Sequence, residues 1–239
     1  MLPLWRVVLG LIAAGPGLLL ADSPAAAQVA APDEGVFRIF IEGREVGTET
    51  FSIRQRGTGP AAVTVAEGRV VLSSPDAASE VRSLVEHALT GQSRLRYQVD
   101  ILGEDRTSIR GRLMGQRFSA QVASPSGEML REHLVSERAV LADRGLAHHY
   151  AFLAPFVEAG DSLVPVIVPQ AGGQFIMTLA DAGYEELVFN GERIRARKIS
   201  VRSEAEPSAS LIWLDTEGRV LRVEQPADGY IALRRGPPR

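Results

Sequence analysis

The sequence predicts an all-β fold with one short helix, arranged as a strongly curved antiparallel meander sheet that forms a half-barrel or incomplete barrel. Most segments alternate apolar and polar residues with the period of two that is typical of half-buried strands. Turn-forming residues separate these segments at short intervals, so hairpin follows hairpin. One stretch, residues 143–154, has the spacing of a short helix. We expect this helix to plug the concave side of a sheet of roughly ten to fourteen strands.

The first residues have the pattern of an export signal. A short cationic start ending at Arg6 precedes the apolar run Val7–Ala21, and the small residues Ala25 to Ala27 follow. This order is typical of a secretory signal peptide cleaved near Ala27. The alternative is an uncleaved membrane anchor, which the helix-breaking Gly15-Pro16-Gly17 disfavours. We therefore predict a periplasmic or secreted protein that does not span the membrane after cleavage.

Composition limits the classes of chemistry. The chain contains no cysteine, which excludes disulfides, thiolate nucleophiles and cysteine-bound metal clusters. The net charge is −3 and the arginines are scattered, so nucleic acid is not an expected partner. After a signal peptide at 1–27, we expect a flexible lead-in at 28–34, one β-rich domain at 35–233 and a tail at 234–239.

The N-terminal part of the domain reads as consecutive strands. Val36–Ile41 alternates into a turn, and a two-residue Gly43-Arg44 loop would pair Ile41 with Val46. Residues 62–73 are again strand-like, with Glu67-Gly68 as a possible turn or bulge. Residues 76–90 are ambiguous between a helix and a strand, and we favour a strand. Further strands are expected at 95–102, 106–114, 117–123 and 128–135.

The helix and the remaining strands follow. Asp143 suits a helix N-cap, and Pro155 should end the helix. Residues 162–169 contain two prolines, which confine them to an edge or irregular strand. Residues 175–179 form another short strand, and residues 230–233 are expected as a last edge strand.

Two hairpins carry the clearest turn signals. Asn190-Gly191 favours a two-residue loop that pairs Val188 with Arg193, Glu186 with Arg195 and Tyr184 with Arg197. In residues 211–223, Asp215 suits the first position of a type I turn and Gly218 the fourth. This second hairpin would place Trp213 opposite Leu221, on an apolar face.

The residues 148–150, His-His-Tyr, are the most suggestive polar cluster. Adjacent histidines on a helix point about 100° apart, so we expect one to pack inward and one to be solvated rather than both to bind a metal ion. Carboxylates lie mostly at turns, and the chain has no nucleophile elbow or phosphate-binding glycine loop. We assign no catalytic residue, metal ligand or cofactor.

Two groups of side chains are candidates for ligand contact. One is a stripe of arginines on residues 193–197, which either faces an anion or lipid head group or forms the solvated face of the sheet. The other is a group of aromatic and histidine side chains, which either lines an apolar groove or fills the core. The candidate anion-binding residues are Arg193, Arg195 and Arg197, and the candidate ligand-binding residues are Tyr97, His148, His149, Tyr150, Phe152 and Trp213.

The chain resembles uncharacterised bacterial exported β-rich families. The resemblance lies in the hairpins of residues 37–49 and 213–224, in Tyr97-Gln-Val-Asp, and in the Ala147-His-His-Tyr helix, and it extends over most of the mature chain. The arrangement is also distantly similar to periplasmic lipoprotein carriers, in which a curved sheet wraps a helical plug and holds acyl chains. This resemblance implies a half-barrel but transfers no site residue.

The predicted function is therefore a non-enzymatic periplasmic binding or carrier module for an apolar or lipid-like ligand. The alternative is a structural or assembly protein of the envelope that works through a protein partner, and an exported hydrolase using His148 or His149 comes third.

Overall fold

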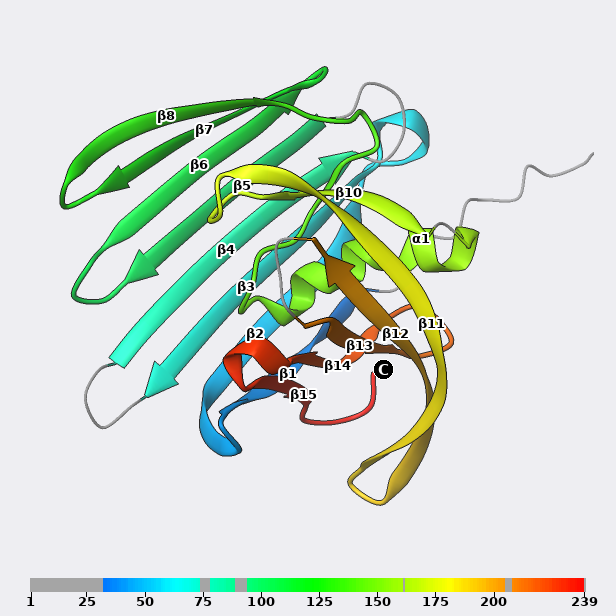
Figure 1. The fold of residues 1–239 in the computed structure, drawn as a ribbon. Coiled ribbons are helices and arrows are strands. Elements are labelled where there is room, and N and C mark those ends of the chain that lie inside the picture. The colour runs from blue at the N-terminus through cyan, green and yellow to red at the C-terminus, as the bar shows by residue number, and fades with distance from the viewer. Residues whose placement is uncertain (1–31, 74–77, 89–93, 161, 205–207, 239) are drawn as a thin grey trace, which may run out of the picture.

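The structure is a computed structural model that describes residues 32–73, 78–88, 94–160, 162–204 and 208–238. The predicted signal peptide therefore lies outside the described residues. The described strands form one sheet of fifteen, with one short α-helix and three 3₁₀ segments (Figure 1). This confirms the predicted all-β class and the curved, incomplete barrel. The strands are β1 Asp33–Ile41, β2 Arg44–Arg56, β3 Val63–Ser73, β4 Ala78–Ala88, β5 Arg94–Leu102, β6 Thr107–Met114, β7 Arg117–Ser124, β8 Gly127–Leu134, β9 Val140–Leu141, β10 Leu163–Val168, β11 Gly173–Phe189, β12 Glu192–Ser203, β13 Ser210–Leu214, β14 Val220–Gln225 and β15 Tyr230–Arg234.

Strand order follows the chain except at one place. β1 pairs with β2 on one side and with β15 on the other, so the first and last strands meet in the middle of the sheet. The two edges are β8 and β9, which follow one another in sequence. The predicted edge position of residues 230–233 is therefore wrong, because β15 is enclosed by β1 and β14. The predicted meander holds except that β9 pairs with β10 in parallel.

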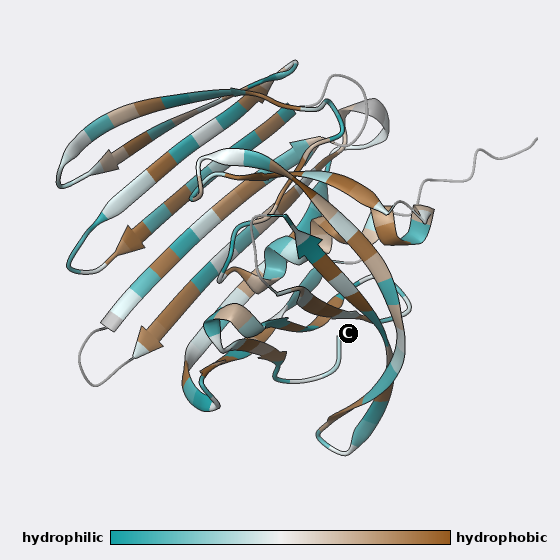
Figure 2. Cartoon of the chain, viewed as in Figure 1, coloured by the Kyte–Doolittle hydropathy of each residue, from teal (hydrophilic) through white to brown (hydrophobic). Residues whose placement is uncertain are grey.

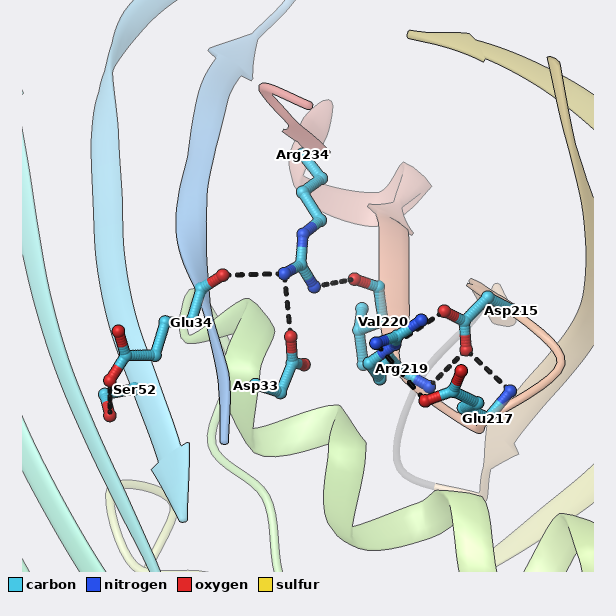
Figure 3. A network of polar contacts seen from close by, with 8 residues as sticks. All are labelled: Asp33, Glu34, Ser52, Asp215, Glu217, Arg219, Val220 and Arg234. Atoms are coloured by element: carbon cyan, nitrogen blue, oxygen red, sulfur yellow. Dashed lines mark hydrogen bonds and ion pairs between the residues drawn. The ribbon is translucent and has the colours of Figure 1, made fainter. Parts of the chain in front are cut away.

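Arg234 stabilises the pairing of β1 with β15. Its guanidinium donates hydrogen bonds to Asp33 Oδ1 and Glu34 O, each at 2.7 Å, and to Val220 O at 3.4 Å (Figure 3). The Arg234 side chain also lies over the ring of Phe51, 5.1 Å from its centroid. Residues 33 and 234, predicted as lead-in and tail, thus belong to the sheet.

Of the ambiguous residues 76–90, residues 78–88 form strand β4 between β3 and β5. The prediction of a strand is therefore confirmed for these residues. The predicted register at Asn190-Gly191 is confirmed at all three pairs. The first hairpin turns at Glu42-Gly43, both with positive φ, so Ile41 pairs with Arg44 instead of Val46. A glutamate in the left-handed region was not anticipated by the sequence pattern.

The 211–223 hairpin combines a correct turn with a shifted register. Gly218 has φ +77°, its N–H bonds Asp215 O at 3.1 Å, and the Asp215 N–H bonds Arg219 O at 3.0 Å. This is the predicted type I turn with a glycine bulge. A register shift after Trp213 then places Trp213 opposite Arg222, not Leu221.

The helical segment is longer and starts later than predicted. A 3₁₀ segment, η2 Ala147–Leu153, continues into α1 Ala154–Ala159. Asp143 is not the N-cap, and Pro155 lies in the first turn of α1 instead of ending a helix, because proline is tolerated there. The segment lies against the inner face of the sheet (Figure 1) and contacts β14, β9, β2 and β3.

Hydrophobic side chains pack on both faces of the sheet. Alternating bands along β4 to β7 in Figure 2 reflect one apolar face and one polar face. The inner faces of the strands and η2 form the main core. A smaller cluster lies on the opposite face of β11 to β14 and consists of Leu187, Phe189, Ala196, Trp213 and Leu221.

Replacement of Trp213 tests the smaller cluster. The side chain is 1% exposed, contacts Lys198 and Arg222 through its ring, and donates from Nε1 to Glu185 Oε2 at 2.9 Å. We expect Trp213→Ala to lower the free energy of unfolding by about 3–5 kcal/mol, measured by urea denaturation followed by circular dichroism. Val188→Ala is the control, because Val188 is 63% exposed on β11, in the preceding hairpin. Equal stability of the two variants would contradict a core role for Trp213.

Candidate functional site

The η2 segment brings together five of the six candidate ligand-binding residues. His148, His149, Tyr150 and Phe152 lie on η2, and Tyr97 of β5 faces it. All five are buried, and the two histidine rings are completely buried with centroids 4.4 Å apart. The expectation that one histidine is solvated is therefore wrong. The 3₁₀ path turns both rings toward the sheet.

A buried carboxylate fixes the start of η2. Glu49 of β2 accepts hydrogen bonds from the N–H groups of Ala147 at 2.8 Å and of His148 at 2.9 Å. Its Oε1 also lies 2.5 Å from Nδ1 of His148. These groups are the unpaired donors that every helix start presents, and an anion is favoured there. Glu49 thus does the work that Asp143 was predicted to do.

His148 extends the contact to a third strand. Its Nε2 lies 3.1 Å from Oγ of Ser83 on β4. A neutral imidazole with its proton on Nδ1 satisfies all partners, because Nδ1 donates to Glu49 and Nε2 accepts from the Ser83 hydroxyl. The Glu49–His148–Ser83 order is that of an acid–base–nucleophile relay. Ser83 is only 6% exposed, between Gly68 and Val99 in the sheet, so we assign the relay a structural role.

A second buried pair joins β5 to the start of the helical segment. The Tyr97 hydroxyl donates to Asp143 Oδ2, and the Gln170 N–H donates to Oδ1 at 3.2 Å. Burial raises the pKa of Asp143 to about 6 and raises the pKa of Tyr97 well above its usual value. His149 accepts the Asp143 N–H at Nδ1, and burial together with His148 lowers the His149 pKa well below its usual value.

A small cavity adjoins this polar network, and we call it the η2 cavity. Its volume is about 220 Å³. Tyr150 forms part of its wall, and the Tyr150 hydroxyl accepts a hydrogen bond from Gln225 Nε2 at 2.7 Å. The lining is mostly apolar, with hydroxyl groups and one guanidinium. The lining residues are Ala142, Arg144, Tyr150, Val168, Ala171, Phe175, Met177, Val201, Ser203 and Ser210.

The remaining candidates lie elsewhere. Trp213 belongs to the smaller cluster on the other face of the sheet, away from η2. In the arginine stripe, Arg193 contacts Glu186 at 3.3 Å and Arg197 contacts Asp181 at 2.8 Å. Arg195 stacks on Tyr184, 4.0 Å from its ring centroid. Each arginine thus has a partner within its own hairpin, and the stripe does not adjoin the η2 cavity.

Sequence reasoning missed Glu49, Ser83 and Gly68. A signal for Glu49 was present, because it shares the inward parity of Gly47, Phe51 and Ile53 in the middle of β2. Gly68, predicted as a turn or bulge, lies inside β3 between Phe51 and Ser83. A Cβ there would lie 2.2 Å from Cε1 of His148, so the ring requires glycine.

Replacing Gly68 tests this packing. We expect Gly68→Ala to lower the free energy of unfolding by about 3 kcal/mol, because the added methyl displaces the buried His148 ring. Gly103→Ala is the matched control, since a Cβ there meets only Ser79 Cβ at 3.8 Å. Denaturation curves of the two variants compare them directly. Equal stabilities of the two variants would show that the His148 ring does not pack closely against residue 68 of β3.

Asp143 should give stability a distinct pH dependence. Its folded pKa of about 6 exceeds the ordinary value of 3.8 for this side chain. Stability from this group is therefore complete below about pH 4 and is lost as the pH rises through 6. Asp143→Asn does not titrate. We expect the stability of the unmodified protein, relative to this variant, to fall by about 3 kcal/mol between pH 4 and pH 7. A constant difference would show that Asp143 titrates normally.

Comparisons with known proteins show the fold. No protein-family model matches the sequence, and no curated protein matches it. No helix in the described ranges combines the length and apolar character needed to span a membrane. The structure is similar to a crystal structure of a β-barrel-like protein of domain of unknown function DUF1849 from Brucella abortus. The TM-score is 0.52 at 9% identity, over 85% of this chain and 94% of that chain. The chain therefore has the fold of an uncharacterised bacterial β-rich protein.

Proposed function

We propose that the protein is a non-catalytic binding module of the bacterial envelope that takes a small apolar or lipid-like molecule into the η2 cavity. The observation that carries this proposal is the cavity itself, an apolar space left between η2 and β10 to β13 in an otherwise packed interior. Apolar pockets with a few convergent polar groups are the usual form of small-molecule sites.

The lining indicates an amphiphile. Val168, Phe175 and Met177 offer apolar contact, whereas the hydroxyls of Ser203 and Ser210 offer hydrogen bonds. Arg144 adds a cationic group to the lining, where it is ion-paired with Asp228. A ligand with an apolar body and a small polar or anionic end matches this set of groups.

The volume of the η2 cavity limits the size of the ligand. Ligand pockets generally span about 300–1,000 Å³, and the η2 cavity is smaller. The broad acyl groove implied by the likeness to lipoprotein carriers is not available, because η2, β9 and the inner strand faces fill the concave side with their own side chains. The ligand we propose is therefore a molecule with one short chain or ring, not a two-chain lipid.

Export forms part of the proposal and rests on the sequence of residues 1–27. The alternative remains an assembly protein that binds a protein partner at a sheet edge. One observation favours it: β8 is an edge strand, and it carries Met129, Leu130 and Leu134 at 54%, 65% and 78% exposure. Exposed apolar edge strands favour pairing with another chain.

Native mass spectrometry tests the proposal on protein purified from the periplasm without detergent. We expect an added mass that disappears after organic extraction. A bare mass with a stoichiometric protein partner would instead support the assembly function. Absence of the protein from the periplasmic fraction would contradict export.

A cavity-filling variant localises the ligand. Val201→Phe places a larger side chain in the η2 cavity, whereas Val188→Phe adds the same atoms at an exposed site. We expect Val201→Phe to lose the added mass and Val188→Phe to keep it, with similar melting temperatures. Retention of the mass by a folded Val201→Phe protein would place the ligand elsewhere. If Val201→Phe does not fold, Ala142→Leu provides the same test.

A further inference from the structure

The outer face of β5 to β8 differs from the rest of the surface. Three rows of outward side chains cross these strands and the end of β4, as the strand register shows. They carry five arginines but only two acidic residues, Glu86 and Glu132. We call this surface the basic face and define it by Arg94, Arg96, Arg110, Arg112, Arg117, Met114, Leu130 and Leu134.

Its central arginines are arranged unfavourably for a surface that meets only water. Arg96 and Arg112 are directly opposite on β5 and β6, and like charges in this position destabilise a sheet. Arg96 approaches Glu86 only to 3.8 Å, and Arg56 shares the same carboxylate. Within the described chain, Arg112 forms no ion pair. By contrast, Arg54 on β2 and Arg69 on β3 have bidentate glutamate partners, and within the basic face Arg110 is paired with Asp100 in the next row.

Large apolar side chains share this face with the arginines. Met114 is 68% exposed, Leu134 78% and Leu130 65%. One row reads Arg94, Met114, Arg117, Leu134 across four strands, so cationic and apolar groups alternate. Several of these side chains line a shallow groove of about 1000 Å³.

We propose that the basic face docks on the surface of an anionic lipid bilayer. Guanidinium groups bind lipid phosphates, and adjacent apolar side chains enter the boundary with the acyl chains. Only a partner with both a negative surface and an apolar layer just beneath it satisfies the whole row. Single-stranded nucleic acid binds through aromatic stacking, and the outward side chains of these three rows include no aromatic residue. This inference does not depend on the η2 cavity.

Vesicle flotation tests the proposal on the protein in the form that the cell produces. The probes are vesicles of phosphatidylglycerol mixed with phosphatidylcholine and vesicles of phosphatidylcholine alone. We expect flotation with the anionic vesicles at low salt, and none with neutral vesicles or at high salt. Equal binding to both vesicle types would overturn the proposal, as would binding of heparin or a protein without binding of vesicles.

Paired variants assign the binding to the basic face. Arg94→Gln with Arg112→Gln should weaken partitioning roughly thirtyfold, given the usual contribution of each basic residue near an anionic membrane. Arg193→Gln with Arg195→Gln makes the same change in net charge on β12 and should leave partitioning unchanged. Met114→Ser with Leu134→Ser should weaken binding while leaving its salt dependence intact. All six side chains are exposed, and melting curves verify the fold.

Two outcomes would contradict the assignment. Equal loss in the two arginine pairs would show attraction by net charge alone. Loss only in the β12 pair would move the membrane contact to the hairpin of Arg193 and Arg195. If the double variant at Arg94 and Arg112 misfolds, Arg112→Gln alone provides the same comparison with Arg193→Gln.

Discussion

The interior of this protein depends on one buried carboxylate. Glu49 is fully inaccessible to solvent, and a charge in such a place is costly unless it is hydrogen-bonded. It accepts from two backbone N–H groups and one imidazole, all from a segment 98 or 99 residues away. This contact sets the position of η2 and directs both histidine rings to the sheet. The η2 cavity follows, because Tyr150 can form its wall only when η2 is held there.

Local sequence rules predicted the fold where a turn alone decides the geometry. Asn190-Gly191 specified three residue pairs between β11 and β12 correctly, because its loop fixes register without help from distant residues. The 211–223 hairpin had the right turn, but the shift after Trp213 changed the pairing. The short β9 was not predictable, since two buried residues join β10 in parallel only after the chain has crossed the interior.

The candidate site was predicted in its residue types but not in its construction. The cluster at 148–150 identified the correct segment, yet a helical wheel could not show that both histidines are buried. The partners of His148, Glu49 and Ser83, come from strands far away in sequence. Trp213 was grouped with them because an aromatic residue in a strand gives no indication of which face packs on which layer. Strand parity gives the face but not the long-range partner.

The pairing of β1 with β15 has a consequence for the order of assembly during synthesis. The hydrogen bond from Arg234 to Asp33 spans 201 residues in sequence. The second edge of β1 therefore stays unpaired until β15 is available. Non-local pairing of this kind slows folding, and a nascent chain exposes the edge of β1 until β15 has been synthesised. The chain can complete its native sheet only after β15 has been synthesised. Until β15 is available, the sheet consists of two unconnected parts, β1 to β8 and β9 to β14.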